Sequence, residues 1–256
     1  MYATDEPSIA PTPARRSDGS ATPDANAARA RSMANAARQT VLRRVAPALK
    51  HDMVVNLQAV AMMAEMLNAR IERGSVSTAD LQSNISKLNR LAREAVMGCV
   101  KVTSWIDAAD EESVPLHQGI QECVGLLSAS FNFRGFAIAN EVTASEFEVC
   151  RHAVRNLLAA SLITMADSAA SACEFVVDAD TTSGFAVVTV RSRPRQQQPA
   201  APIPPATEAG PRPVVDWNEV QALAAAEGAE IARTDDGITL KLPRAVVTSP
   251  LQMAPV

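Results

Sequence analysis

Two long runs of apolar residues, spaced three and four apart, dominate the first half of this 256-residue chain. That spacing places the apolar side chains on one face of a helix and therefore predicts two long amphipathic helices. The first stripe comprises Val45, Leu49, Met53, Leu57, Val60, Met63 or Ala64, Leu67 and Ile71, and the second comprises Leu81, Ile85, Leu88, Leu91 or Ala92, Ala95, Cys99, Val102 and Ile106. The short link at residues 73–77 predicts an antiparallel hairpin. Because a lone hairpin leaves apolar surface uncovered, we expect two chains to form a four-helix bundle.

Shorter elements follow from residue 115 onward. Their predicted order is helix, strand, helix, strand, strand, helix, strand, strand, which fits an α/β sandwich with helices on one sheet face. The predicted helices are 116–128, 147–168 and 216–227, and the predicted strands are 135–142, 173–178, 185–191, 230–234 and 237–242. The fold class is therefore α+β, with the helical hairpin preceding the sandwich.

The composition also suggests domain boundaries. Residues 1–30 are rich in Pro, Ala, Ser, Asp and Arg without an apolar period, so we expect this segment to be disordered. The hairpin then spans 31–110 and the α/β domain spans 115–243, with a proline-rich disordered loop at 192–213 and a flexible tail at 244–256. Pro47 lies inside the first helix and is expected to kink or cap it.

Charge and cysteine content exclude several classes of function. The net charge is −4, which does not favour nucleic acid or a membrane surface as partner. The four cysteines are far apart, and no His/Cys cluster suggests a metal site or a disulfide framework. Neither a signal peptide nor an apolar run of membrane-spanning length is visible, so we expect a cytoplasmic protein.

His51 is the strongest candidate for a chemical role among the three histidines. It precedes Asp52 and falls between the stripe residues Leu49 and Met53, so its ring is expected to face solvent. A neutral imidazole can accept a phosphoryl group, and most histidine is neutral near pH 7. His117 and His152 lack a comparable setting and are expected to be ordinary surface or boundary residues.

Several motifs in this order resemble those of sensor histidine kinases. The stretch RRVAPALKHDMVVNLQAVAMMAEML resembles the phosphoacceptor helix, and LQSNISKLNRLAREAVMGCVKVTSWI resembles its partner helix. RHAVRNLLAASLITMADSA resembles the helix that carries the asparagine box of the ATP-binding domain, and VVDWNEVQALAAAEGAEIARTDDGITLKLP resembles its last helix and hairpin. The resemblance covers about residues 37–243 and implies a two-component signalling protein.

The departures from that family concern ATP binding. In active kinases the box is Asn-Leu-Leu-x-Asn-Ala, and its second asparagine helps to hold Mg²⁺. Here Asn156-Leu157-Leu158-Ala159 is followed by Ala160. In the family a later strand ends in Asp-x-Gly-x-Gly, whereas here it ends in Val190-Arg191-Ser192-Arg193-Pro194. Phosphate-binding loops need glycine and free backbone N–H groups, and this stretch has no glycine. We therefore expect no cofactor of the chain's own.

This combination resembles phosphorelay histidine phosphotransferases. The resemblance implies that His51 is the phosphoacceptor and that Asp52 orients or polarises its imidazole. Response-regulator receiver domains are the implied partners, and they are expected to supply the Mg²⁺. Lys50, Met53, Val54 and Asn56 are the expected partner-binding residues. Val55 stands four residues after His51, where the family often has Asn or Thr to position a water for phosphatase activity, so the resemblance does not imply that activity here. Arg151 and Arg155 are expected to be solvated charges.

Two alternatives remain open at this point. A pseudokinase without catalysis could bind response regulators or a kinase, and this function would not need His51. An ATP-dependent histidine kinase with a divergent pocket is the less favoured alternative because the asparagine and the glycines are missing.

Overall fold

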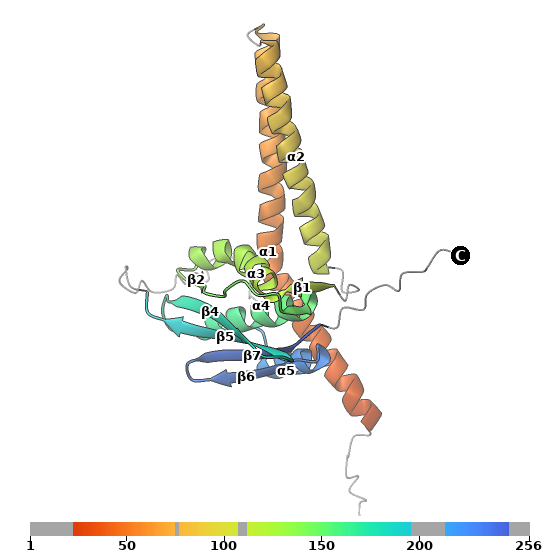
Figure 1. Cartoon of the computed structure of the whole chain (residues 1–256), viewed down its shortest axis with the longest axis vertical. Coiled ribbons are helices and arrows are strands. Elements are labelled where there is room, and N and C mark those ends of the chain that lie inside the picture. Colours follow the sequence, from red (N-terminus) through yellow and green to blue (C-terminus); the bar gives the residue numbers. More distant parts are fainter. Residues whose placement is uncertain (1–22, 75–76, 107–111, 196–212, 246–256) are drawn as a thin grey trace, which may run out of the picture.

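The computed structural model describes residues 23–74, 77–106, 112–195 and 213–245. Two long helices, α1 (Pro23–Glu72) and α2 (Thr78–Ile106), pack side by side as an antiparallel hairpin that stands out from an α/β unit (Figure 1). The Ser77 hydroxyl accepts a hydrogen bond from the backbone N–H of Asp80 at 3.1 Å, which caps the start of α2. Within the described residues, no helix is long and apolar enough to span a membrane.

The start of α1 corrects the predicted N-terminal boundary. Residues 23–30, expected to be disordered, form the first turns of α1, and the other residues of the predicted segment lie outside the described ones. Pro23 at the first helical position, Asp24 in the first turn and a run of alanines all favour helix there, although none of them produces an apolar stripe. Pro47 is exposed and α1 continues through it, so it does not cap the helix.

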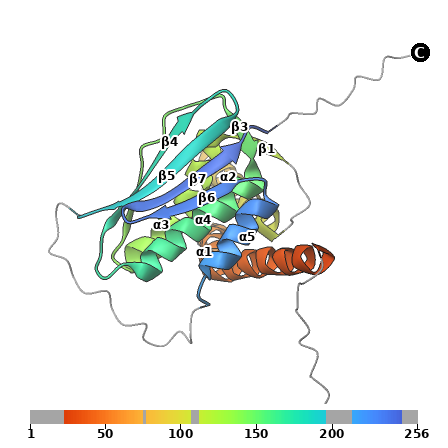
Figure 2. The ribbon, with the colours of Figure 1, turned by 90° about the horizontal axis from the view of Figure 1, so that it is seen from below.

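The two halves of α1 have different neighbours. Its N-terminal half packs against the α/β unit, mainly along α5, as Figure 2 shows. Val45 and Leu49, expected in the hairpin stripe, belong instead to the core shared with the α/β unit. The C-terminal half of α1 pairs with α2 (Figure 1). One uninterrupted helix therefore links both parts of the molecule.

The α/β unit is a sheet with helices on one face (Figure 2). The five-stranded sheet has the order β2-β4-β5-β7-β6, in which β2 and β4 are parallel and the other pairs are antiparallel. A separate two-stranded ribbon joins β1 to β3. The strands are β1 (Ser113–Pro115), β2 (Ala137–Asn140), β3 (Glu148–Cys150), β4 (Glu174–Thr181), β5 (Phe185–Arg193), β6 (Glu230–Thr234) and β7 (Gly237–Pro243), and the helices are α3 (Leu116–Phe133), α4 (Arg151–Ser168) and α5 (Trp217–Ala226).

The predicted α+β class and the order of the main elements are confirmed. The short strands β1 and β3 were not predicted, and the helix expected at 147–168 begins only at Arg151, after β3. Helix α3 extends to Phe133 rather than to 128, and β5 extends to Arg193, two residues into the predicted loop. Residues 196–212 of that loop and 246–256 of the predicted tail lie outside the described residues.

A buried charge network joins α2 to the α/β unit. The Arg155 guanidinium donates hydrogen bonds to the Ser104 hydroxyl at 3.1 Å and to the Glu122 carboxylate at 2.8 Å, and it stacks over the Trp105 ring. Arg151 donates two further bonds to Glu122 at 2.7 Å. Arg155 is only 4% exposed, so the expectation of a solvated charge was wrong. Its partners lie 33 and 51 residues away, beyond the reach of a local sequence pattern.

Candidate functional site

His51 lies where α1 leaves the α/β unit. The side chain is 70% exposed, as expected from its place off the apolar stripe, and Asp52 is 49% exposed. Nδ1 of His51 lies 3.8 Å from Oδ1 of Asp52, which is too long for a hydrogen bond but close enough for electrostatic attraction. The ring is therefore accessible, with a carboxylate beside Nδ1.

The other predicted site residues occupy different surroundings. Lys50 is exposed, while Met53 and Val54 are half-buried. Asn56 is also half-buried and faces α2, because its Nδ2 lies 3.3 Å from where a Cβ on Gly98 would stand. Gly98 thus makes room for the Asn56 amide inside the hairpin. Asn56, one of the residues expected to bind a receiver domain, is therefore directed toward α2.

A cleft of about 520 Å³ opens beside His51, between α1 and the C-terminal end of α3. We call it the α1–α3 cleft. His51 and Asp52 line it together with Phe133, whose side chain is 86% exposed at the last residue of α3. The full lining is Arg43, Arg44, Pro47, Ala48, His51, Asp52, Ala129, Ser130, Phe133, Arg134 and Pro213.

Asp167 holds the two sides of this cleft together. Its carboxylate accepts hydrogen bonds from both terminal nitrogens of Arg44, at 2.7 and 2.8 Å, and from Arg134 at 3.0 Å. Arg44 also donates to the backbone carbonyl of Pro213 at 3.0 Å. Bidentate pairs of this kind fix geometry as well as charge. This cluster was not predicted from the sequence, where its local signal is the Arg43-Arg44 pair before His51.

The face of α4 that carries the asparagine box is closed. Asn156 lies 3.5 Å from the Glu227 carboxylate, which also accepts hydrogen bonds from Arg38 at 2.9 and 3.2 Å. Ala160, at the expected Mg²⁺-ligand position, is fully buried, as is Ser161 beside it. Mg²⁺ needs oxygen ligands, and a buried methyl group offers none. These residues therefore do not fit Mg²⁺-nucleotide.

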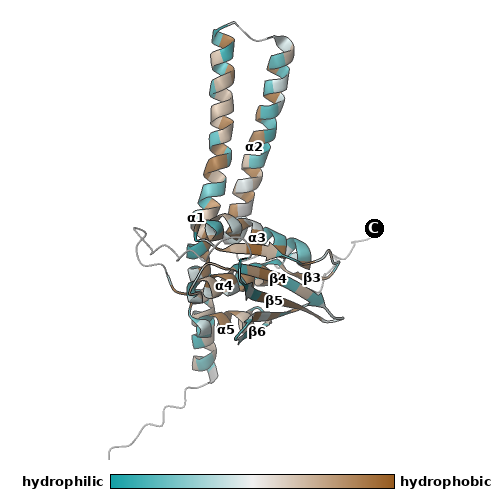
Figure 3. Cartoon of the chain, turned by 90° about the vertical axis from the view of Figure 1, so that its left-hand side faces the viewer, coloured by the Kyte–Doolittle hydropathy of each residue, from teal (hydrophilic) through white to brown (hydrophobic). Residues whose placement is uncertain are grey.

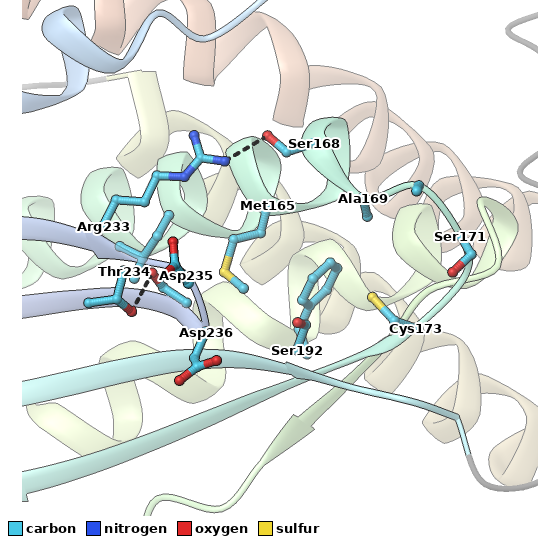
Figure 4. A pocket seen from close by; sticks show the side chains of 14 residues that line it. Met165, Ser168, Ala169, Ser171, Cys173, Ser192, Arg233, Thr234, Asp235 and Asp236 are labelled. Atoms are coloured by element: carbon cyan, nitrogen blue, oxygen red, sulfur yellow. Dashed lines mark hydrogen bonds between the residues drawn. The ribbon is translucent and has the colours of Figure 1, made fainter.

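A smaller cavity of about 290 Å³ remains between the end of α4 and the β6–β7 turn (Figure 4). Ser192, next to the last residue of β5, lines it. Asp235 and Asp236 also line it, so phosphate groups would meet negative charge. Burial raises the pKa of the Cys173 thiol, another lining residue. Among the described residues, no group of three or more His, Cys, Asp or Glu side chains could hold a metal ion.

The remaining histidines have structural settings. Nδ1 of His117 lies 3.3 Å from the backbone nitrogen of Ser145 and 3.0 Å from its carbonyl oxygen, and this contact ties α3 to the segment before β3. His152 is half-buried in the first turn of α4.

Comparisons with known proteins give likenesses in structure. No family model matches the chain, and no curated relative matches it. Among solved structures, the Acinetobacter baumannii histidine kinase AdeS is 12% identical, with 74% of this chain and 98% of that chain covered and a TM-score of 0.41. A histidine kinase from Burkholderia phymatum STM815 is 17% identical, with coverages of 81% and 97% and a TM-score of 0.39. A bacterial phosphotransferase is 17% identical, with coverages of 77% and 93% and a TM-score of 0.34.

Proposed function

We propose that this chain is a histidine phosphotransferase of a two-component phosphorelay, carrying a phosphoryl group on His51 between receiver-domain aspartates without binding ATP. The observation that carries the proposal is the pairing of an exposed imidazole at His51 with a closed α4 face at Ala160. An exposed ring can be approached in line by a phosphorylated partner. Among the described residues, Ala160 offers no Mg²⁺ ligand on α4, so in this proposal the phosphoryl group comes from such a partner.

In this proposal the two ring nitrogens of His51 have separate tasks. Nδ1 is the nitrogen near the Asp52 carboxylate, so Nε2 is the one left to attack phosphorus. As the N–P bond forms, the bond from phosphorus to the aspartyl oxygen breaks and the receiver aspartate leaves as a carboxylate. The resulting imidazolium keeps its proton on Nδ1, where Asp52 stabilises it electrostatically. Transfer to a second receiver reverses these steps, and each receiver brings its own Mg²⁺.

The proposal includes a homodimer. Large apolar side chains are exposed along both helices of the hairpin, in contrast to the polar surface expected of an isolated helix pair. Figure 3 shows hydrophobic residues along both helices. A second copy that covers them would complete the four-helix bundle. These exposed side chains are Val55, Leu57, Met62, Met66, Ile71, Ile85, Val96, Met97 and Val100.

The direct test follows labelled phosphate from a panel of phosphorylated receiver domains to the purified chain. Transfer is expected to wild-type protein and to His152→Ala, and to be lost in His51→Ala. Incubation with labelled ATP and Mg²⁺ alone is expected to leave the chain unlabelled. Equal labelling of His51→Ala, or labelling from ATP alone, contradicts the proposal.

The α1–α3 cleft favours one second candidate, a non-catalytic module that binds a response regulator or kinase. Its exposed Phe133 and arginines could serve binding whether or not His51 is phosphorylated. Receiver binding without any transfer to wild-type protein would select this function over the phosphotransferase.

A further inference from the structure

The α1–α3 cleft carries a surplus of positive charge on an acidic protein. Arg43, Arg44 and Arg134 are among its lining residues. The nearby carboxylates are Asp52, which also lines the cleft, and Asp167, which pairs with Arg44 and Arg134. One positive charge is therefore left over, although the whole chain has a net charge of −4. Such a local field attracts a carboxylate-rich surface and speeds its encounter with the cleft.

Phe133 gives the same cleft an apolar contact point. A phenylalanine that is 86% exposed is unusual for a residue type that is among the most often buried. Phe131, two residues earlier, is 2% exposed and packs against Phe136 and Phe175 in the core. The end of α3 therefore directs one ring inward and presents the other beside the arginines. Aromatic side chains and arginines are both enriched at protein interfaces, so this combination marks a candidate contact surface.

The cleft is also held at a fixed position relative to His51. Arg44, two helical turns before His51 on α1, is bound at both terminal nitrogens by Asp167 of α4. Arg134, next to Phe133, is bound by the same carboxylate. A surface fixed in this way loses little conformational entropy when a partner binds.

We propose that the α1–α3 cleft is a second docking surface for the receiver domain, so that the α/β unit contacts the partner whose aspartate faces His51. This inference rests on the proposed function. A phospho-aspartyl site binds Mg²⁺ through clustered carboxylates, so the partner must bring an acidic surface to His51. That surface meets the surplus positive charge of the cleft, and an apolar side chain at its margin packs on Phe133.

The test uses full-length protein and the receiver domain that transfers fastest in the panel, or binds most tightly if none transfers. Phe133→Glu is expected to weaken receiver binding about tenfold or more, as the loss of a dominant contact does. Arg43→Glu is expected to slow association and to reduce its dependence on salt. The matched control is Phe185→Glu, since Phe185 is an exposed phenylalanine at the start of β5 and does not line the cleft. Thermal melting verifies that each variant is folded.

Labelling by phosphoramidate, a small phosphodonor that needs no docking, separates this inference from the proposed function. Equal labelling of wild type and Phe133→Glu by phosphoramidate, together with slow transfer from the receiver to Phe133→Glu, supports the docking surface. Unchanged receiver binding and transfer in Phe133→Glu and Arg43→Glu overturns it and leaves the phosphotransferase proposal standing. If no receiver transfers to wild type, the proposed function fails, and the binding affinities of the same variants still decide whether the cleft is a docking surface.

Discussion

Replacing Glu122 with glutamine is expected to destabilise the folded chain strongly at pH 7. The carboxylate is 22% exposed and is the common acceptor for Arg151 and Arg155. Glutamine keeps one oxygen acceptor but no charge, so Arg155, at 4% exposure, loses its anionic partner. Uncompensated buried charges cost about 3–5 kcal/mol, and the partial exposure and retained acceptor reduce this to about 2–3 kcal/mol.

The pH dependence of the same variant provides a second check. Burial alone would raise the pKa of the Glu122 carboxyl, but hydrogen bonds from Arg155, Arg151 and Gln118 outweigh it and hold this pKa below the usual value of 4.5. Because the folded-state pKa is the lower one, this stabilisation is present above about pH 4.5 and is lost as the pH falls through the folded-state value. The wild-type and Glu122→Gln unfolding free energies should therefore converge below pH 4.5.

Urea unfolding at fixed protein concentration, repeated from pH 7 down to pH 3, measures both effects. Glu112→Gln is the matched control, because Glu112 pairs with the same Arg151 but is 54% exposed and should matter by less than about 1 kcal/mol. A Glu122→Gln protein as stable as wild type at pH 7, or an equal difference at every pH, would refute the reasoning.

Three further predictions concern packing, assembly and reactivity. Gly119→Ala should lower the unfolding free energy by about 1–3 kcal/mol in urea titrations, because the new Cβ would lie 2.7 Å from a methyl carbon of Val154. Gly125→Ala, on the same helix, is the control: its Cβ would stand in open space, so the substitution should be neutral or stabilising. Val96, on α2, is 62% exposed, and Val96→Glu places a charge among the exposed apolar side chains. Light scattering is expected to give the mass of a dimer for wild type and of a monomer for this variant, and equal masses would contradict the bundle. Because the pKa of the Cys173 thiol is raised in the folded protein, its alkylation by iodoacetamide at pH 8 should be slower in folded protein than in urea. Peptide mass spectrometry measures both rates, and equal rates would contradict this prediction.

Local patterns in the sequence predicted the main elements of this fold. The apolar stripes of the hairpin and the alternation in β4, β5 and β7 arise from neighbouring residues, so they are visible along the chain. Only residues 23–30 of α1 were wrongly expected to be disordered. The packing of the N-terminal half of α1 against the α/β unit was not foreseen, because its buried contacts begin with Ala34 and Ala37, whose small side chains do not stand out in an alanine-rich segment. Strands β1 and β3 are only three residues long, too short to show a period.

The candidate site likewise has one part that local sequence patterns predict and one part that they do not. His51 and Asp52 are adjacent, so their position and exposure could be predicted from one helix. The α1–α3 cleft is built from residues 43–52, 129–134 and Pro213, whose proximity depends on the tertiary fold. Arg155 was misjudged for the same reason, because both of its charged and hydroxyl partners come from other helices.

Because α1 is continuous, the spacing between Leu49 and His51 fixes the direction in which the His51 ring points from the helix axis. Leu49 is anchored in the core of the α/β unit, and two residues later the imidazole emerges on the same helix. Each residue of an α-helix turns the chain by about 100°, so one inserted or deleted residue here would swing the ring away from Phe133 and the arginines. Homologous chains that share this chemistry should therefore tolerate changes of length at the hairpin tip far better than at this junction.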